Sequence, residues 1–238
     1  MTEDRGELPP GLALAWGVQP VQRRGPKPAL SVDRIVATGI EFGDRYGFEA
    51  VSLQRIAAEL GVTTNAMYRY VRSKEELIVL VHDKAVGVPP ELPSGWRAAA
   101  TAWVHAQVGL YARRPWLLDV PLRGAPVTPN LLRWVEVMLA ALAETGLSHH
   151  DNLGCLVLLD GYARNYGALA RQLGAQVGTP VQAEQVGQFL VPRLIEGGYP
   201  MVTSLYLDQE YEDELDDDLE FGLGRILDGI EVLIAGKG

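Results

Sequence analysis

The residues best suited to chemistry in this 238-residue chain lie close together in its N-terminal third. Hydroxyl, amide, guanidinium and phenol groups gather in one short stretch: Thr64, Asn65, Tyr68, Arg69 and Tyr70. Amide and guanidinium groups hydrogen-bond the edges of bases, and hydroxyls and cations bind phosphate oxygens. The set therefore indicates contacts to nucleic acid.

Two short helices joined by a tight turn are expected to position these side chains. Ser52 precedes an apolar run at helical spacing and can cap the first helix. Gly61 follows that run, where a left-handed backbone is usual, and Thr63 or Thr64 can cap the second helix. Helices joined in this way form a helix-turn-helix unit, whose second helix enters the major groove of DNA. The alternative is an ordinary helical hairpin with a polar surface.

The charge of the chain is divided between a basic and an acidic part. The formal net charge is −9, yet residues 20–74 hold nine Lys and Arg against five Asp and Glu. Residues 75–238 hold eleven against twenty-two, so only the first part is suited to phosphate. Arg23, Arg24 and Lys27 form the densest basic cluster, and nearby prolines keep it extended. This arm either reaches the DNA backbone or minor groove, or is a solvated linker.

Residues 23–85 carry these features in the order of a known family. The segment resembles the N-terminal domain of the TetR family of bacterial transcriptional repressors. The motifs that carry the resemblance are Gly47-Phe48, Ser52-Leu53, Ile56-Ala57, Leu60-Gly61-Val62, Met67-Tyr68, Tyr70-Val71, and Lys74 with Leu77.

The resemblance implies roles for the matching residues. Ser52, Tyr68 and Lys74 should bind phosphate. The residues that should face bases are Gln54, Thr64, Asn65, Ala66 and Arg69. The full expected DNA-binding set is Arg23, Arg24, Lys27, Ser52, Gln54, Thr63, Thr64, Asn65, Ala66, Tyr68, Arg69, Tyr70 and Lys74. This set departs from that of the tetracycline repressor, so neither its operator nor its drug carries over.

The whole sequence predicts an all-α protein of about nine to ten helices, with an N-terminal three-helix helix-turn-helix domain and a larger C-terminal domain. We expect a flexible extension at 1–22, a DNA-binding domain with its arm at 23–88, and a ligand-binding and dimerisation domain at 94–238. The Pro-rich stretch 88–93 marks the boundary. Leu12, Leu14 and Trp16 could dock the extension on the body, and the sequence leaves this open.

Apolar periodicity and capping residues place the remaining helices. Ser31 and Ser73 should cap helices of the first domain, and Ser94 and Ser148 helices of the second. The expected helices of the second domain are 95–113, 115–120, 129–145, 149–173, 180–196 and 221–235.

Two helices of the second domain are expected to pair with a second copy of the chain. Both combine glycines with apolar residues, and the resemblance implies a four-helix bundle between subunits. The expected dimerisation residues are Gly161, Gly167, Phe221, Leu223, Leu227 and Ile230. The alternative is that both helices pack inside the protomer. A two-fold dimer would present two recognition helices to a palindrome with half-sites about 34 Å apart.

The resemblance also implies a pocket for a small-molecule effector, expected to be apolar or aromatic. The candidate lining residues are Trp103, Gln107, Tyr111, Trp116, Trp134, Tyr162, Asn165 and Tyr166. Asn165 is favoured if it is buried, because a buried amide needs partners. The alternative for each aromatic residue is an ordinary place in the core.

Several other classes of protein are disfavoured by the sequence. No metalloprotease, phosphate-loop or nucleophile-elbow motif is present, so we expect no enzyme, cofactor or metal site. The lone Cys155 and the absence of a long apolar run favour a cytoplasmic protein. The expected function is a ligand-responsive regulator, a repressor released from a palindromic operator by a small molecule. The alternative is a DNA-binding protein without small-ligand control, architectural or regulated by another protein.

Overall fold

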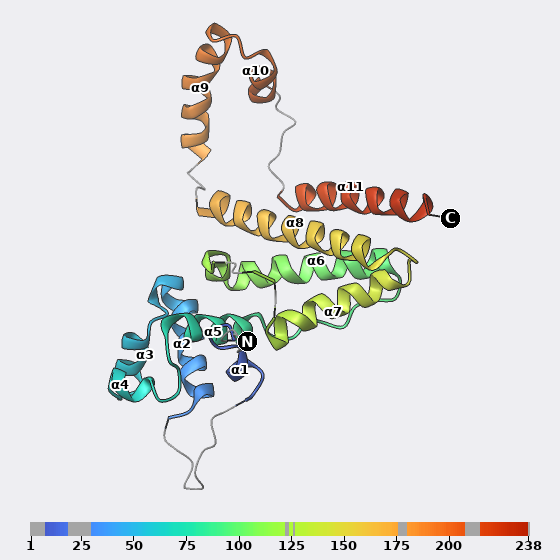
Figure 1. The fold of residues 1–238 in the computed structure, drawn as a ribbon. Helices are drawn as coiled ribbons and strands as arrows, with labels where there is room; N and C mark the ends of the chain where they lie inside the picture. The colour runs from blue at the N-terminus through green and yellow to red at the C-terminus, as the bar shows by residue number, and fades with distance from the viewer. Residues whose placement is uncertain are drawn as a thin grey trace, which may run out of the picture.

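The computed structural model describes residues 8–18, 30–121, 124–125, 127–175, 180–207 and 215–237. Within these residues every regular element is a helix (Figure 1), which confirms the all-α class. The arm residues Arg23, Arg24 and Lys27 lie outside the described residues.

The N-terminal part comprises α1 Leu12–Ala15, α2 Val32–Tyr46, η1 Phe48–Ala50, α3 Leu53–Glu59, α4 Thr64–Met67 and α5 Lys74–Val86. Four capping side chains fix the starts of its main helices, each accepting the backbone N–H three residues on: Ser31, Ser52, Thr63 and Ser73. Of the two candidate threonines, Thr63 is therefore the cap. The apolar faces of these helices meet in a shared core that includes the fully buried Ile56 and Met67.

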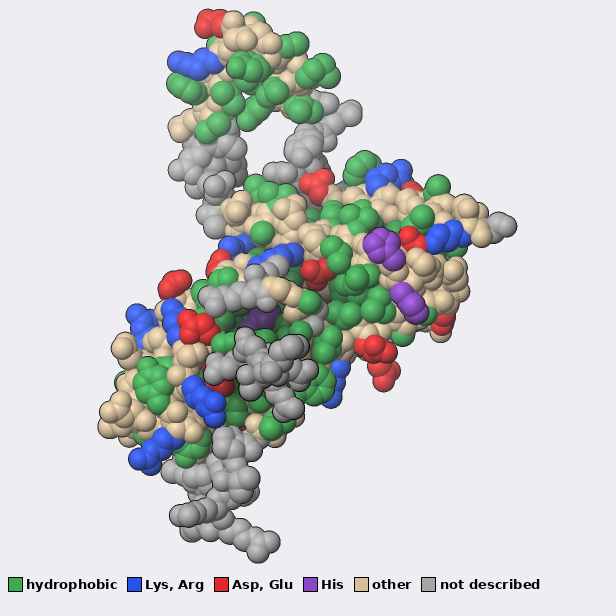
Figure 2. All heavy atoms as spheres, in the orientation of Figure 1, with side chains coloured by type: hydrophobic (Ala, Val, Ile, Leu, Met, Phe, Trp, Pro, Cys, Tyr) green, Lys and Arg blue, Asp and Glu red, His purple; other side chains and the backbone are tan. Residues whose placement is uncertain are grey.

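The larger part comprises α6 Trp96–Arg113, η2 Pro115–Asp119, α7 Pro129–Ala143, α8 His149–Ala175, α9 Pro180–Glu196, α10 Pro200–Leu207 and α11 Leu215–Ala235. The long helix α8 packs against α6, α7 and α11. The helices α9 and α10 pack on each other and stand away from the other helices in Figure 1. Apolar side chains cover much of this hairpin (Figure 2), among them the exposed Phe189, Tyr199 and Leu205.

Three details differ from the sequence-based expectation. The helices α1 and α10 were not expected, because four and eight residues give too little periodicity to recognise. At the start of α6 the N-cap is Gly95 with φ +85°, and no side chain caps the helix, so Ser94 does not take that role. The helix α11 begins at Leu215, six residues before the expected start at 221.

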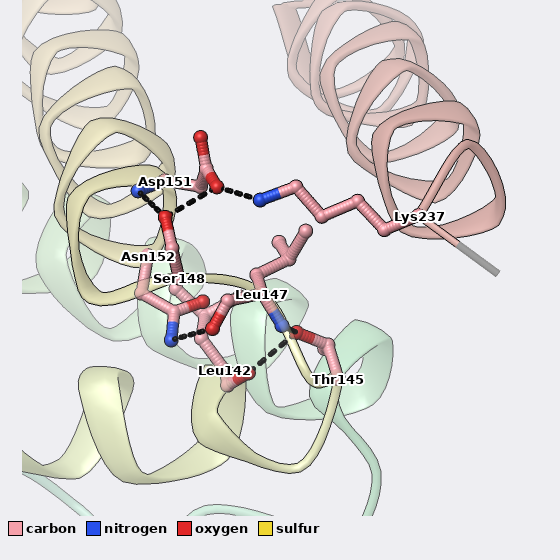
Figure 3. Close-up of polar contacts among 7 residues, drawn as sticks. All are labelled: Leu142, Thr145, Leu147, Ser148, Asp151, Asn152 and Lys237. Atoms are coloured by element: carbon pink, nitrogen blue, oxygen red, sulfur yellow. Dashed lines mark hydrogen bonds and ion pairs between the residues drawn. The ribbon is translucent and has the colours of Figure 1, made fainter.

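The helices α8 and α11 run antiparallel, and side-chain contacts fix them at two points. Near the start of α8, Ser148 accepts the backbone N–H of Asp151 at 3.2 Å and donates to its carboxylate at 2.5 Å. The same carboxylate accepts from Nζ of Lys237, just beyond α11 (Figure 3). Further along, the hydroxyl of Tyr162 donates to the carbonyl of Leu219 at 2.9 Å. The last helix is thereby held along α8.

The buried carboxylate of Asp83 joins the N-terminal part to the larger part. It accepts the backbone N–H groups of Asn130 at 2.8 Å and Leu131 at 3.3 Å, at the start of α7. The Asn130 amide nitrogen donates back to Asp83 at 3.0 Å. A carboxylate at a helix N-terminus satisfies donors that have no partner within the helix. The helix α5 is therefore bonded directly to α7.

Candidate functional site

The turn between α3 and α4 sets the direction of the second helix. Gly61 has φ +67°, in the left-handed region that favours glycine. The N–H of Val62 donates to the carbonyl of Ala57 at 3.0 Å, and the N–H of Gly61 to Ala58 at 3.1 Å. This pair of bonds is the Schellman ending of α3, which satisfies its last carbonyls and redirects the chain into α4.

The residues around α4 divide into a buried and an outward set. Met67 and Val71 are fully buried in the core. The expected DNA-binding residues that are exposed are Gln54, Thr63, Asn65, Tyr68, Arg69 and Lys74. Those that are half-buried are Ser52, Thr64, Ala66 and Tyr70. Tyr70 packs against the core, so its phenol is the least available of the set.

Two further cations lie exposed in this region, Arg55 on α3 and Arg72 beyond α4. Both contribute to the positive charge of residues 20–74, but neither was expected from the sequence to contact DNA. Because the phosphate backbone attracts any accessible cation, both extend the basic surface around the outward residues.

Trp116, expected in the ligand pocket, lies instead at the junction of the two parts. Its indole N–H donates to the Asp44 carboxylate of α2 at 2.8 Å, and Arg114 donates to the same group at 3.1 Å. Gly43 allows this approach, because a Cβ there would lie 2.6 Å from the Trp116 ring. Trp116 therefore stabilises the contact between the N-terminal part and the larger part.

A cavity of about 440 Å³ lies between α5 and the helices of the larger part. Its walls are mainly apolar and include Ile78, Val79, Trp103, Trp134, Val135 and Leu156. Volumes of this size accommodate drug-sized ligands, which such apolar walls desolvate. The cavity therefore has the size and lining of a small-molecule site.

Two polar atoms in the cavity wall lack hydrogen-bond partners among the described residues. The amide nitrogen of Gln107 donates to Asp160 at 3.2 Å, but its Oε1 is buried and unpaired. Thr128 Oγ1 is also buried and unpaired. Since leaving a buried polar atom unpaired costs about 1–3 kcal/mol, both atoms are available to a ligand hydroxyl or amine.

Two ionisable side chains of the cavity have shifted pKa values. Burial, with a smaller contribution from the Arg164 guanidinium, lowers the pKa of His82 to about 4. Burial, followed by the nearby Asp160, raises the pKa of Tyr111. Both side chains are therefore neutral at pH 7, and Arg164 supplies a permanent positive charge.

Four of the eight candidate ligand residues line the cavity: Trp103, Gln107, Tyr111 and Trp134. The others do not contribute to its lining. Tyr162 faces α11 through its hydroxyl, and Tyr166 is buried in the core. Asn165, which was favoured only if buried, is exposed; it lies on the outward side of α8.

The expected dimerisation residues lie in different surroundings. Leu223, Leu227 and Ile230 are already buried inside the protomer, and Gly167 lies against the Tyr111 ring. Only Gly161 and Phe221 face outward. On α8 and α11, only the other faces are therefore open to a second copy. A shallow groove between these helices is lined by Gly154, Leu158, Gly229 and Leu233, among others.

His82, Asp160 and Arg164 also line the cavity, although they were not expected there from the sequence. A signal was available for two of them, since Asp160 and Arg164, one helical turn apart, are the only charged residues of the sequence between Asp151 and Arg171. His82 was assigned to the DNA-binding domain, and nothing in the sequence places the end of α5 against the larger part.

Two family models match the chain. "Bacterial regulatory proteins, tetR family" matches residues 30–81, and "Tetracyclin repressor-like, C-terminal domain" matches residues 89–234. The chain belongs to the TetR family. This member is thus a DNA-binding transcriptional regulator, and the outward residues of α3 and α4 belong to the helix-turn-helix unit of its family.

Relatives and solved structures agree with this membership. The HTH-type transcriptional repressor DrrR1 of Streptomyces coeruleorubidus is 36% identical, covering 98% of this chain and 89% of its own. Apo ActR of Streptomyces coelicolor matches with a TM-score of 0.73 at 22% identity, over 90% of this chain and 100% of ActR. ActR in complex with actinorhodin matches with a TM-score of 0.72 at 24% identity, over 88% and 99%. The structures show the shared fold.

Among the residues that the structure describes, no helix is long and apolar enough to cross a membrane. In the same residues, no group of three or more His, Cys, Asp or Glu side chains is placed to hold a metal ion.

Proposed function

We propose that this regulator is a repressor that a small aromatic effector releases from operator DNA in the cytoplasm, without catalysis. The observation that carries the proposal is that α5 extends from the outward residues of α4 to the cavity. Its first residue, Lys74, follows the outward residues of α4 and is exposed. One and two turns later, Ile78 and His82 line the cavity. We call the helices α3 and α4, with the outward residues around them, the reading head. A ligand that displaces α5 at the cavity therefore moves the reading head, as in other switches in which helices shift.

The cavity suggests the chemistry of the effector. The rings of Trp103 and Trp134 suit a flat apolar body, and Arg164 suits a carbonyl, phenolate or carboxylate on it. The unpaired Gln107 Oε1 calls for a hydroxyl or amine donor. A polycyclic aromatic molecule with hydroxyl and acidic groups meets these needs. ActR, solved with actinorhodin and with (S)-DNPA, lends support as a protein of the same fold.

DNA binding is proposed for residues 23–88, by the outward residues described above and by the arm. Residues 94–238 are proposed to bind the effector and to form a homodimer through the outward faces of α8 and α11. Gly154, Leu158 and Gly161 recur at helical spacing on the exposed side of α8, and apolar surface of this kind favours association. Two copies would meet a palindrome with half-sites about 34 Å apart.

A binding titration on the DNA upstream of the gene, with footprinting and a set of hydroxylated aromatic compounds, tests this function. The expected result is protection of a palindrome at nanomolar-range affinity, lost when one compound binds and quenches Trp103 and Trp134. Gln107→Leu should keep DNA binding and lose the response. Tight, sequence-specific binding that none of the compounds releases would favour a regulator controlled by another protein. Sequence-blind binding alone would favour an architectural protein.

A further inference from the structure

The N-terminal segment, residues 8–18, is docked on the body of the protein, although both family models begin after it. Its short helix α1 contacts α5 (Figure 1), and Leu14 and Ala15 pack against the core. The indole N–H of Trp16 donates to the carbonyl of Val127 at 2.9 Å, just before α7. The segment therefore bridges the two parts of the molecule.

Gly11 fits the segment closely to α5. It is buried and has φ +78°. A Cβ at this position would lie 3.1 Å from the carbonyl oxygen of Glu76 and 3.2 Å from Cβ of Val79. A backbone carbonyl cannot rotate away as the end of a side chain can, so a larger residue must shift the segment against α5 by a few tenths of an ångström. Gly17, at the other end of α1, has a similar φ of +76° but nothing within 4 Å.

The same segment forms part of the cavity wall. Pro9, Pro10 and Leu12 line the cavity together with Val79 and His82 of α5. The other walls belong to helices of 13 or more residues and to the connection before α7, which contributes Val120, Pro121, Gly124, Ala125, Val127 and Thr128. A helix of four residues is not stable by itself in water, so this wall depends on its docking contacts for its shape.

We propose that Pro9 to Trp16 form the outer wall of the effector site and set its affinity and selectivity. The inference rests on the effector pocket proposed above. The apolar wall removes ligand surface from water. The hydrogen bond from Trp16 to Val127 holds this wall against the start of α7. Ligands are therefore selected in part by a segment outside the two domains that define the family.

The test uses the full-length protein and anilinonaphthalene sulfonate, an aromatic anion whose fluorescence rises in apolar sites. Gly11→Ala is compared with its matched control Gly17→Ala, because both add one Cβ at a left-handed position and only the first meets α5. Leu12→Ser removes an apolar wall group without touching the backbone. Leu131→Trp adds bulk at a lining position of α7 and reports whether the dye occupies the cavity.

We expect one dye per protomer, about five- to tenfold weaker binding in Gly11→Ala and Leu12→Ser, and unchanged binding in Gly17→Ala. DNA affinity and helical content should remain as in the wild type, which excludes misfolding, whereas each alanine at a left-handed position should lower the melting temperature. If Gly11→Ala and Leu12→Ser bind the dye as tightly as the wild type while Leu131→Trp loses binding, the proposed role of the N-terminal segment is wrong. The dye would still occupy the cavity in that case. Absent binding, or binding that Leu131→Trp does not change, would overturn the pocket for aromatic anions and the inference with it.

Discussion

Arg69 is an exposed cation of the reading head, directly after the helix α4. If its guanidinium pairs with a base, Arg69→Ala should weaken operator binding by about 1–3 kcal/mol and relax specificity at one base position. Titration of operator variants with single base changes measures both effects. Arg133→Ala, an exposed Arg on α7, is the control and should change neither. Equal weakening on every sequence would assign Arg69 to phosphate.

His82 makes the stability of the protein depend on pH. The folded state keeps this side chain neutral down to its pKa of about 4, whereas the unfolded chain takes up a proton near pH 6.5. Between these values the unfolded state binds more protons. The stabilisation present above pH 6.5 is therefore lost as the pH falls toward 4, at up to about 1.4 kcal/mol per pH unit.

Denaturant unfolding of the wild type and His82→Gln from pH 7 to pH 4 measures this contribution, since the other titrating groups are common to both proteins. The wild type should lose stability more steeply. Parallel curves would mean that His82 titrates in the folded state as it does in the unfolded chain.

At the scale of single residues, the sequence predicted what depends on local structure. The caps Ser52 and Thr63 and the buried Met67 follow from neighbours in the chain, and the structure places them as expected. Asn165 and Trp116 could not be placed, because the side of a long helix or turn that faces a cavity is decided by residues distant in sequence.

Among the elements, α5 links the reading head to the cavity, and its bond to α7 can be weighed by a double-mutant cycle. Asp83→Ala leaves two backbone N–H groups at the start of α7 without their acceptor, so it should destabilise the fold by about 1–3 kcal/mol. Asn130→Ala removes the returning bond. The double variant should destabilise by less than the sum of the single variants, with a coupling of about 0.5–3 kcal/mol in chemical denaturation. Additive effects would show that the two residues stabilise the fold separately.

The helix α1 shows why an element can be absent from a sequence-based prediction. Its four residues supply no periodic pattern, and its conformation comes from packing on α5 rather than from helix propensity. The long helices α6, α7 and α8 were located from the sequence to within two residues at most of their bounds, because caps and apolar repeats extend over several turns.

For the molecule as a whole, the proposed dimer surface can be tested at a glycine. Gly161 faces open space, with no atom within 4 Å of an added Cβ. Gly161→Arg should leave the protomer folded, since replacing a helical glycine gains up to about 1 kcal/mol. A bulky cation should nevertheless keep two copies apart, so sedimentation should show a monomer.

Gly174→Arg is the matched control, because Gly174 also lies in α8 with open space around it, away from the stripe of Gly154, Leu158 and Gly161. This variant should sediment as the wild type does. A dimeric Gly161→Arg would rule out close contact of α8 between subunits.

Directed evolution of a new effector response could begin at the codons for the outer wall. The codons for Pro9 to Trp16 form one short block, and the wall that they encode meets the cavity without supplying any residue of the reading head or of α8 and α11. A library made with a single degenerate oligonucleotide would therefore change which effectors the protein binds, while the operator sequence that it recognises stays the same.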